Sequence, residues 1–564
     1  MNIVENKKVR VGLLIDGFDV PAWEYKMIES IIADNYSNII LIVKRKHSSD
    51  RPKKLKEKFQ DYIKYFFFKA YNIIESKIFT YSPDAFAIMN YQHLVSDVPI
   101  MEVDCVETKF SDSLYDKDIE MIKNYQLDVF IRLGFRILRG EILKSSRLGV
   151  WSYHHGDNFH YRGGPAVHWE VLKREREVGS ILQILTEDLD GGIVLHRSWS
   201  SVQKSVTKTT NNLYWKTAQF IPRKLKELSI KGEVSFIKDH SEKNNQLSFY
   251  SDSNYTIPTN LEFLKLFIPF FFEALGHKIL KVFNFQQWIM MYAFSKQEGA
   301  IMVGYKYKRL LPPKDRYWAD PFTVYENGKH FIFFEEVIPQ GKLERGHLSV
   351  IEIDRKGNIT TPQIILKQPY HLSYPFIFNH EGTYFMIPET EENNTVQLYE
   401  CIDFPLQWKF KMNLMENVKA VDTTLLIKDN KFWLFTSICA TEGAPYSDEL
   451  FLFSSDELFT NNWKPHPLNP IVSDVKSARS AGKIFKRNNK FYRPSQDCSF
   501  RYGYATIINE IIELNDEQYC EKEVTAIKPD WSPDLLAAHT FNYDNGLSVI
   551  DVNVLRKKRF LFLN

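Results

Sequence analysis

The chain has 564 residues, and its 72 lysines and arginines nearly balance its 70 aspartates and glutamates. A formal net charge of +2 excludes a bulk electrostatic attraction to nucleic acid, so we expect no nucleic-acid partner. The hydrophobic fraction of 44% and the charged fraction of 25% are typical of a folded globular protein, and the length predicts two to four domains. The five cysteines form no C-x-x-C pair, which argues against a disulfide framework and a structural zinc site and favours a cytoplasmic location.

Residues 1–230 alternate between short apolar runs and helical patterns. A buried strand, VRVGLLID, precedes a helix from Ala22 to Ala33, and the apolar runs NIILIV, DVFIRLGF and GVWSYHHG follow. The segment ILQILTEDLDGGIVLHRSW supplies the last strands. This alternation predicts an α/β, Rossmann-like domain with a mostly parallel sheet and helices on both faces. We expect its ligand site in the loops at the carboxyl ends of the strands.

Residues 231–299 are predicted to form a helical linker. Its most apolar part, residues 261–285, contains several charges and Pro269, and its longest uncharged run has seven residues, Leu266 to Phe272. That run is far shorter than the ~20 apolar residues that span a bilayer. Two interpretations stay open: a helix docked between two domains, or peripheral membrane contact through residues 261–285. We expect no signal peptide, because the amino terminus lacks a long apolar region.

Residues 300–564 lose the helical period and contain an internal repeat. Five segments share one plan: a short strand, a polar turn and an apolar strand. They are ADPFTVYENGKHFIFFEE, YPFIFNHEGTYFMIPET, DTTLLIKDNKFWLFTS, AGKIFKRNNKFYRPSQD and AHTFNYDNGLSVIDVN, with turns at Gly328, Gly382, Asn430, Asn489 and Gly546. Glycine and asparagine tolerate the positive φ of a tight hairpin. Five all-β units of about 50 residues predict a five-bladed β-propeller, with a β-sandwich as the alternative.

Matched positions of this repeat carry polar or aromatic residues. They are Asp320, Tyr374, Asp422, Arg479 and His539 before the turns, and Glu335, Glu389, Ser437, Gln496 and Asn553 after them. Equivalent positions in a radial array lie at the same height, so we expect these side chains to converge on a saccharide site. The alternative is that Asp320 and Asp422 only cap turns or hold blades together.

A second motif lies in the amino-terminal half. The segment GVWSYHHGDNFHYRGGPAVHWEVLKREREVGSILQILTEDLDGGIVL resembles the formyltransferase family, which includes methionyl-tRNA and sugar N-formyltransferases. The family signature runs Asn-x-His, a Pro-Ser-Leu-Leu-Pro loop, Tyr-Arg-Gly and then Asp-x-Gly. Here His154, the run Tyr161-Arg162-Gly163 and the pair Asp190 and Gly192 match it. Ser152 stands in place of the asparagine, and residues 155–159 replace the loop.

This resemblance implies transfer of a formyl group from N10-formyltetrahydrofolate to an amine. His154 would act as base or proton shuttle, Asp190 would orient it, and Ser152 would take the place of the oxyanion donor. The implied cofactor-binding residues are His155, Gly156, Asp157, Asn158, Arg162 and Gly163. Three interpretations stay open: an active formyltransferase with an altered loop, a related transferase with another donor, or a domain retained for binding.

The carboxy-terminal repeat also has relatives. The segments YWADPF, HLSYPF, MIPET, AVDTT and RPSQD resemble the amino-terminal domain of glucosamine inositolphosphorylceramide transferases, which is similar to five-bladed glycoside hydrolases of the arabinanase type. Such hydrolases use an acid and a base carboxylate. Asp320 matches the base, but Tyr374 stands where an aspartate is expected and Asp422 where the acid glutamate is usual. The resemblance therefore favours saccharide or glycolipid binding over hydrolysis.

The sequence thus predicts a multidomain enzyme. It combines a formyltransferase-like α/β domain over residues 1–230, a helical linker over 231–299 and a five-bladed propeller over 300–564. The leading hypothesis is N-formylation of a nucleotide- or lipid-linked amino sugar in surface polysaccharide or glycolipid biosynthesis, with a glycan-binding propeller. One alternative is a glycoside hydrolase-like propeller beside an inactive first domain, and another is a binding protein without turnover.

Overall fold

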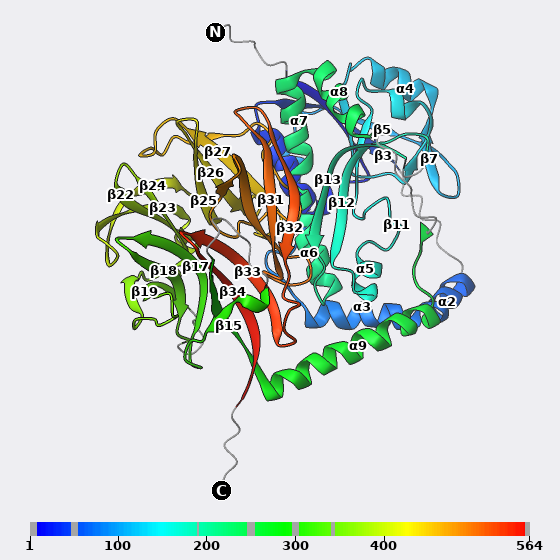
Figure 1. The fold of residues 1–564 in the computed structure, drawn as a ribbon. Helices are drawn as coiled ribbons and strands as arrows, with labels where there is room; N and C mark the ends of the chain where they lie inside the picture. The colour runs from blue at the N-terminus through cyan, green and yellow to red at the C-terminus, as the bar shows by residue number, and fades with distance from the viewer. Residues whose placement is uncertain are drawn as a thin grey trace. The chain divides into compact units, whose positions relative to one another are not determined.

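The computed structural model describes residues 8–46, 55–188, 191–244, 254–295, 304–339 and 345–558. Unit 1 comprises Met1–Phe271 and Ala440–Pro445, and unit 2 comprises Phe272–Cys439 and Tyr446–Asn564 (Figure 1). This division differs from the three predicted parts. Strand β15 (Asn284–Phe294) falls within the predicted linker 231–299 but pairs with strands of unit 2, so the all-β region begins before residue 300.

Unit 1 is built on a seven-stranded sheet with the order β13-β12-β10-β8-β1-β3-β5. Its strands are β1 (Val9–Ile15), β3 (Ser37–Arg45), β5 (Ile100–Val103), β8 (Val129–Arg132), β10 (Val150–His154), β12 (Glu177–Ile184) and β13 (Ile193–Ser201). The pairings from β5 through β10 are parallel, whereas β12 runs antiparallel to both of its neighbours. The predicted mostly parallel sheet is confirmed.

Helices cover both faces of this sheet, as the alternating pattern predicts. The helices described in unit 1 are α1 (Ala22–Ala33), α2 (Leu55–Lys64), α3 (Phe66–Ile78), α4 (Asp116–Lys123), α5 (His168–Lys173), α6 (Val206–Thr217), α7 (Phe220–Lys231), α8 (Glu233–Asn244) and the start of α9 (Asn260–Phe283). One apolar core packs α1, α7 and α8 on one face of the sheet, and a second packs α4 on the other. Short pairs, among them β11 (Arg162–Gly163) with β14 (Asn254–Tyr255), lie outside the main sheet.

The described part of unit 2 contains five four-stranded antiparallel sheets. Four of them follow chain order: β17 (Tyr317–Glu326), β18 (Lys329–Val337), β19 (Gly346–Ile353) and β20 (Gln363–Leu366); β21 (Ser373–His380), β22 (Thr383–Thr390), β23 (Thr395–Asp403) and β24 (Gln407–Glu416); β25 (Ala420–Lys428), β26 (Lys431–Ile438), β27 (Leu450–Ser455) and β28 (Lys464–Pro465); β29 (Phe485–Arg487), β30 (Lys490–Asp497), β31 (Ala505–Leu514) and β32 (Tyr519–Ile527). Each sheet packs against the next. This is a propeller-type arrangement.

The fifth sheet joins the two ends of unit 2. It has the order β16-β15-β34-β33 and combines β15 and β16 (Lys308–Leu310) with β33 (Leu535–Asp544) and β34 (Leu547–Lys557). Strand β33 packs against β17 of the first sheet, so the ring of sheets is closed. Such a closed ring leaves only short, protected strand edges.

The first four repeated segments are the hairpins that open the four sheets built from consecutive strands, and the fifth segment is the hairpin β33–β34 of the fifth sheet. At every predicted turn two successive residues have positive φ, for example Asn327 at 49° with Gly328 at 83°, and Asp429 at 54° with Asn430 at 57°. Two-residue hairpins of this handedness require positive φ at both central positions. This requirement explains why asparagine and glycine recur there.

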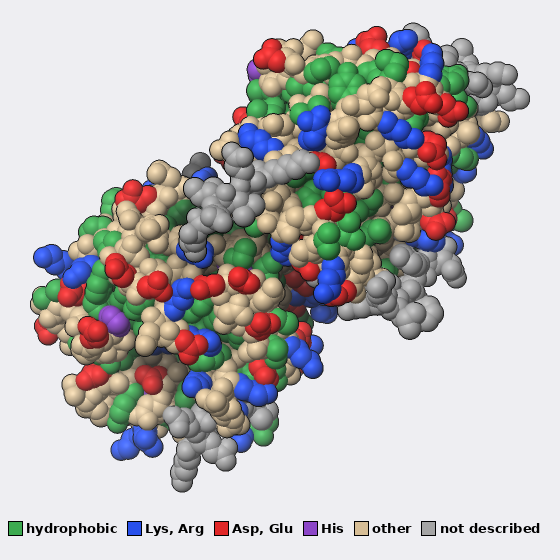
Figure 2. Space-filling view, turned by 90° about the horizontal axis from the view of Figure 1, so that it is seen from above, with side chains coloured by type: hydrophobic (Ala, Val, Ile, Leu, Met, Phe, Trp, Pro, Cys, Tyr) green, Lys and Arg blue, Asp and Glu red, His purple; other side chains and the backbone are tan. Residues whose placement is uncertain are grey.

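The surface has mixed charge. On the face shown in Figure 2, basic and acidic side chains alternate without a large field of one sign, as a net charge of +2 leads one to expect. Among the described residues, none of the helices combines the length and apolar character needed to cross a bilayer.

Candidate functional sites

The backbone has the same distortion, a positive φ at a register shift, at three of the predicted site residues of unit 2. Asp320, Tyr374 and Asp422 have φ values of 48°, 44° and 50°, and each lies where the pairing of an opening hairpin shifts register. Positive φ is uncommon for residues other than glycine, and a bulge redirects the side chains around it. The same register shift with positive φ therefore recurs at the same position in three sheets. It directs side chains from different sheets toward one another.

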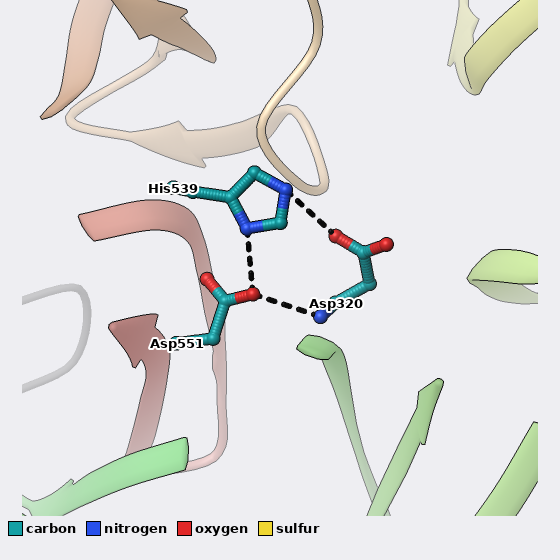
Figure 3. Close-up of side chains that lie close together, drawn as sticks. All are labelled: Asp320, His539 and Asp551. Atoms are coloured by element: carbon teal, nitrogen blue, oxygen red, sulfur yellow. Dashed lines mark hydrogen bonds and ion pairs between the residues drawn. The ribbon is translucent and has the colours of Figure 1, made fainter. Parts of the chain in front are cut away.

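The first group of gathered side chains joins the first and fifth sheets. Asp551 Oδ2 accepts hydrogen bonds from the backbone N–H of Asp320 at 2.9 Å and from Nδ1 of His539 at 2.6 Å (Figure 3). Nε2 of His539 lies 3.4 Å from Oδ1 of Asp320. All three side chains are buried. The imidazole thus bridges two carboxyl groups.

The second group is centred on Asp422. Its Oδ2 accepts a hydrogen bond from Nε of Arg479 at 2.5 Å and one from the amide of Gln496 at 3.0 Å. The other side of the Arg479 guanidinium lies 3.6 Å from Oε2 of Glu389, which also accepts from the backbone N–H of Asp422 at 3.3 Å. Arg479 and Glu389 keep about 11% of their side chains exposed, so this group reaches the surface.

Burial, together with an excess of carboxyl groups over cations, sets the protonation of this cluster. Burial, followed by the neighbouring Asp422, raises the pKa of Glu389 to about 8. Burial and then Glu389 raise the pKa of Glu335 well above its usual range, and burial does the same for Asp320 although His539 opposes it. Neutral carboxylic acids and charged groups therefore coexist here, as in sites that donate and accept protons.

His539 and Asp551 form the charged pair within the cluster. Burial alone would lower the pKa of His539, but Asp551 and then Asp320 raise it to about 9. Burial would raise the pKa of Asp551, but His539 outweighs this effect and lowers it. These three residues also place one possible metal-ligand atom each within 4.8 Å of one another. A metal would need the neutral imidazole, so the cation favoured at neutral pH competes with it.

Most predicted residues of unit 2 enter the cluster, but in different roles. Glu335 is coupled electrostatically to the other carboxyl groups and lies 3.3 Å from His371. Tyr374 is fully buried, and its hydroxyl is held by Thr424 at 2.9 Å and by the backbone N–H of Gly482 at 2.8 Å. The structure thus places Tyr374 between strands, where its hydroxyl is already satisfied. It corrects the expectation that this side chain faces a ligand.

Two members of the cluster are absent from the sequence prediction. Asp551 supplies the acceptor that holds His539, and it precedes by two residues the matched position Asn553 of the repeat. Tyr502 is half-exposed, its hydroxyl lies 3.3 Å from Nε2 of His539, and its ring lies 5.0 Å from the Arg479 guanidinium. An aromatic ring beside buried polar groups is a common feature of saccharide-binding sites.

In unit 1, the predicted catalytic residues lie at the carboxyl end of β10. Ser152 and His154 share one face of this strand because side chains alternate. Ser152 is buried, and its Oγ accepts a hydrogen bond from the guanidinium of Arg132 at 3.1 Å. Nε2 of His154 lies 3.4 Å from the carbonyl oxygen of Tyr161. Asp190 lies outside the described residues, so its predicted contact with His154 stays a prediction.

Arg132 is a feature that the motif comparison missed. It ends β8, beside β10, and also donates to the carbonyl groups of Phe135 and Arg136. Burial raises the pKa of Glu24 in α1 to about 8, although the positive charge of Arg132 opposes this shift. A partly buried guanidinium therefore occupies the neighbourhood of Ser152, where the family pattern has an asparagine.

The predicted cofactor loop is bonded to the unit's own side chains. His155 stacks on Tyr214 at 3.7 Å, and burial lowers its pKa to about 3. Asp157 pairs with Arg197, and Asn158 accepts from the same guanidinium at 2.8 Å. Gly156 packs against His154, while Arg162 and Gly163 form β11. His155, Asp157 and Asn158 are thus engaged by side chains of unit 1, and binding of the folate cofactor that the resemblance implied stays a prediction.

A pocket of about 340 Å³ opens beside this loop. Acidic and aromatic side chains line it: Asp157, His160, Tyr161, Glu175, Glu177, Trp199 and Tyr255, with Gly179. The hydroxyl of Tyr161 donates to Glu175 at 2.6 Å, and the Tyr161 and Tyr255 rings stack at 5.1 Å. Because Tyr161 also contacts His154 through its carbonyl, the pocket lies next to the predicted base.

Comparison with known proteins gives separate relatives for the two kinds of motif. The family model "Glucosamine inositolphosphorylceramide transferase 1, N-terminal" matches residues 312–533. The glucosamine inositolphosphorylceramide transferase 1 of Arabidopsis thaliana is 34% identical over 210 residues, which are 36% of this chain and 27% of that protein. The methionyl-tRNA formyltransferase of Chlorobium chlorochromatii is 24% identical over 151 residues, 26% of this chain and 46% of that protein. The chain thus spans about a quarter of the length of the first relative.

A solved structure is also similar to part of the chain. The family 117 glycoside hydrolase Zg3597 of Zobellia galactanivorans aligns with 48% of this chain and 91% of its own, at 10% identity and a TM-score of 0.32. So low a score carries no argument about activity.

Proposed function

We propose that unit 2 binds a saccharide at the cluster around Asp422 and His539, and that the protein serves as a transferase in glycolipid or surface polysaccharide assembly. The observation that carries the proposal is the convergence of repeat-matched polar side chains from separate sheets. The family match over residues 312–533, whose name refers to a glucosamine-containing glycolipid, supports a saccharide as the ligand. Charged groups with a half-exposed aromatic ring suit sugar hydroxyls and the apolar face of a sugar ring.

Binding is favoured over hydrolysis by the state of Asp320. The predicted base must be ionised to activate water. Burial raises the pKa of Asp320, and its Oδ2 accepts a hydrogen bond from the backbone N–H of Tyr374 at 3.3 Å. Its Oδ1 faces His539. The carboxyl group therefore ties three sheets together and is poorly placed to act as a base.

A glycan array that includes free-amine and N-acetylated hexosamines tests the proposal. The wild-type chain should bind a subset of glycans, and Glu389→Ala should weaken that binding about tenfold or more, because it removes the hydrogen-bonding groups at the exposed edge of the cluster. Glu352→Ala is the matched control, since Glu352 lies on the exposed side of β19 and pairs with Lys329. An equal loss of glycan binding in both variants, or no glycan binding by the wild type, would contradict the proposal.

A second candidate function is N-formylation of an amino sugar in unit 1. The pocket favours it, because several carboxylates suit a protonated amine and aromatic rings suit a sugar face, and because the pocket adjoins His154. There His154 would accept a proton from the attacking amine. Binding of N10-formyltetrahydrofolate beside His154 is part of this candidate function and stays a prediction.

Mass analysis of products tests this second candidate. The chain is incubated with N10-formyltetrahydrofolate and a panel of nucleotide-linked amino sugars. Formylated product that disappears in His154→Ala and Asp190→Asn would support the candidate. A Glu177→Gln variant should then raise KM more than it lowers kcat, because Glu177 lines the pocket. Absence of product with the wild type contradicts it and leaves the saccharide site of unit 2 unaffected.

A further inference from the structure

A second aromatic side chain lies beside His539 in unit 2. Trp288 of β15 is partly exposed, and its ring centroid lies 4.7 Å from that of His539, with 43° between the ring planes. Trp288 pairs with Asn553 of β34, and Asp551 lies two residues from Asn553, on the same face of that strand. The strand that closes the ring of sheets thus brings an aromatic ring to the imidazole held by Asp551.

Trp288 and Tyr502 meet nearly at a right angle, with His539 against both of them. The ring centroids of Trp288 and Tyr502 lie 6.5 Å apart, and their planes are inclined by 85°. The His539 ring lies 5.3 Å from that of Tyr502. Tyr502 is 48% exposed, and its ring also lies 5.0 Å from the Arg479 guanidinium. We call Trp288, Tyr502 and His539 the aromatic corner, and Tyr502 links this corner to the group centred on Asp422.

The loop that carries Tyr502 is held against β33. The backbone N–H of Ala538 donates to the carbonyl of Tyr504 at 3.1 Å. Gly503 has a φ of 60°, and a Cβ at this position would lie 2.6 Å from the Cβ of His539, so the close approach requires glycine. Because the loop is already ordered against the strand that bears His539, ligand binding loses less conformational entropy here than it would in a loose loop.

The angle between the two rings decides how many sugar units the aromatic corner can accept. A sugar ring stacks on an aromatic side chain through one of its broad C–H faces, and the two broad faces of a pyranose chair are nearly parallel to each other. Rings inclined by 85° therefore cannot both stack on one chair. Two consecutive sugar units can occupy them, because rotation about the glycosidic bond turns one chair relative to the next.

We propose that the aromatic corner is a second sugar subsite, so that unit 2 recognises a hexosamine-containing oligosaccharide and not a single sugar. This inference rests on the proposed saccharide site of unit 2. One sugar unit contacts Glu389 and Arg479 and lies against Tyr502, and the next unit stacks on Trp288. Trp288 lies outside the family match over residues 312–533, so the closing strand β15 adds this part of the site.

Calorimetric titration of the full chain tests the proposal. The probes are glucosamine, N-acetylglucosamine, and the chitosan and chitin oligomers of two and three units. Wild-type affinity should rise about tenfold or more from one unit to two, because the second unit gains a stacking surface. Trp288→Leu should remove most of this rise and leave the affinity for one unit within about twofold, whereas Trp288→Phe, which retains an aromatic face, should keep most of the rise. The matched control is Trp408→Leu on β24, where another partly exposed tryptophan packs against Phe333.

Four results would overturn the second subsite. They are equal wild-type affinity for one unit and two, unchanged affinity of Trp288→Leu for two units, equal weakening of one-unit and two-unit binding in Trp288→Leu, and failure of every probe to bind the wild type. In each case the proposed saccharide site would stand if the array showed glycan binding that Glu389→Ala weakens. Thermal unfolding shows whether Trp288→Leu keeps its fold, and the length dependence of the wild type decides the proposal without any variant.

Discussion

Individual residues in the central cluster of unit 2 hold more protons in the folded state than in the unfolded state. His539, with a pKa of about 9, and Glu389, with a pKa of about 8, both titrate above the values of exposed groups. The charged imidazole bonded to Asp551 stabilises the fold, whereas the Glu389 carboxyl is favoured in its neutral form. The charge of the cluster, and with it the stability of unit 2, therefore depends on pH.

The sign of this dependence can be measured. A raised folded-state pKa of His539 gives stability that is present in full below about pH 6.5 and is lost as the pH rises through about 9. Ionisation of Glu389 as the pH rises through about 8 acts in the same direction. We expect the free energy of unfolding of unit 2 to fall by on the order of 3 kcal/mol from His539 alone between these limits.

Calorimetric unfolding of the wild type and His539→Gln across this pH range is the measurement. The variant should be less stable at pH 6 and should show a shallower fall toward pH 9, because it lacks the proton that the wild type loses. A wild-type stability that rises over the same range would contradict the assignment of charge to His539 and Asp551.

For individual residues, the sequence predicted which side chains lie close together but not which hydrogen bonds they form. Asp422, Arg479 and Gln496 converge as their repeat positions indicate. Asp551 was missed because a register shift between Ala538 and Phe541 changes which residue of β34 faces His539, and such a bulge leaves no mark in the residue pattern. Arg132 was missed for a related reason: its contact with Ser152 depends on the pairing of β8 with β10.

For some helices and turns, the local sequence pattern was sufficient to predict the structure. The helix Ala22–Ala33 and the five hairpin turns follow from local patterns, because the apolar period of a helix and the positive φ of a tight turn are local requirements. Helix α9 shows the opposite case. Its sequence is apolar on two sides, and only the structure shows that Phe263 is packed while Phe272 is exposed.

This contrast within α9 gives a prediction at the scale of the element. Phe263→Ala should lower the free energy of unfolding of unit 1 by about 3–5 kcal/mol, because it removes a buried ring between α3 and α9. Phe272→Ala should change it by less than about 0.5 kcal/mol, because that ring is exposed. Denaturant titration measures both. Similar effects for the two variants would contradict the packing of α9 on α3.

The whole molecule divides differently from the sequence prediction because of one long-range pairing. Strand β15 pairs with β34 over its full length, from Asn284 with Lys557 to Phe294 with Leu547. The partners are more than 250 residues apart in the chain, and local patterns carry no information about such a contact. The predicted boundary at residue 300 therefore cut through a sheet, although the repeat itself was recognised.

Ring closure by this sheet predicts a sharp dependence on the carboxy terminus. A chain that ends before Leu547 lacks β34, the strand that joins β15 to β33, and should leave unit 2 without cooperative unfolding. A chain that ends after Lys558 retains every described strand and should unfold as the full chain does. Calorimetry of the two truncations separates these cases. Cooperative unfolding of unit 2 in the shorter chain would contradict the closure.

The most direct test of the saccharide site is a crystal structure of the full chain with a hexosamine-containing glycan selected on the array. We expect the sugar to contact Glu389 and Arg479, with a ring face against Tyr502, since these are the members of the cluster that reach the surface. A sugar bound elsewhere on unit 2, or bound only in the pocket of unit 1, would contradict the proposal.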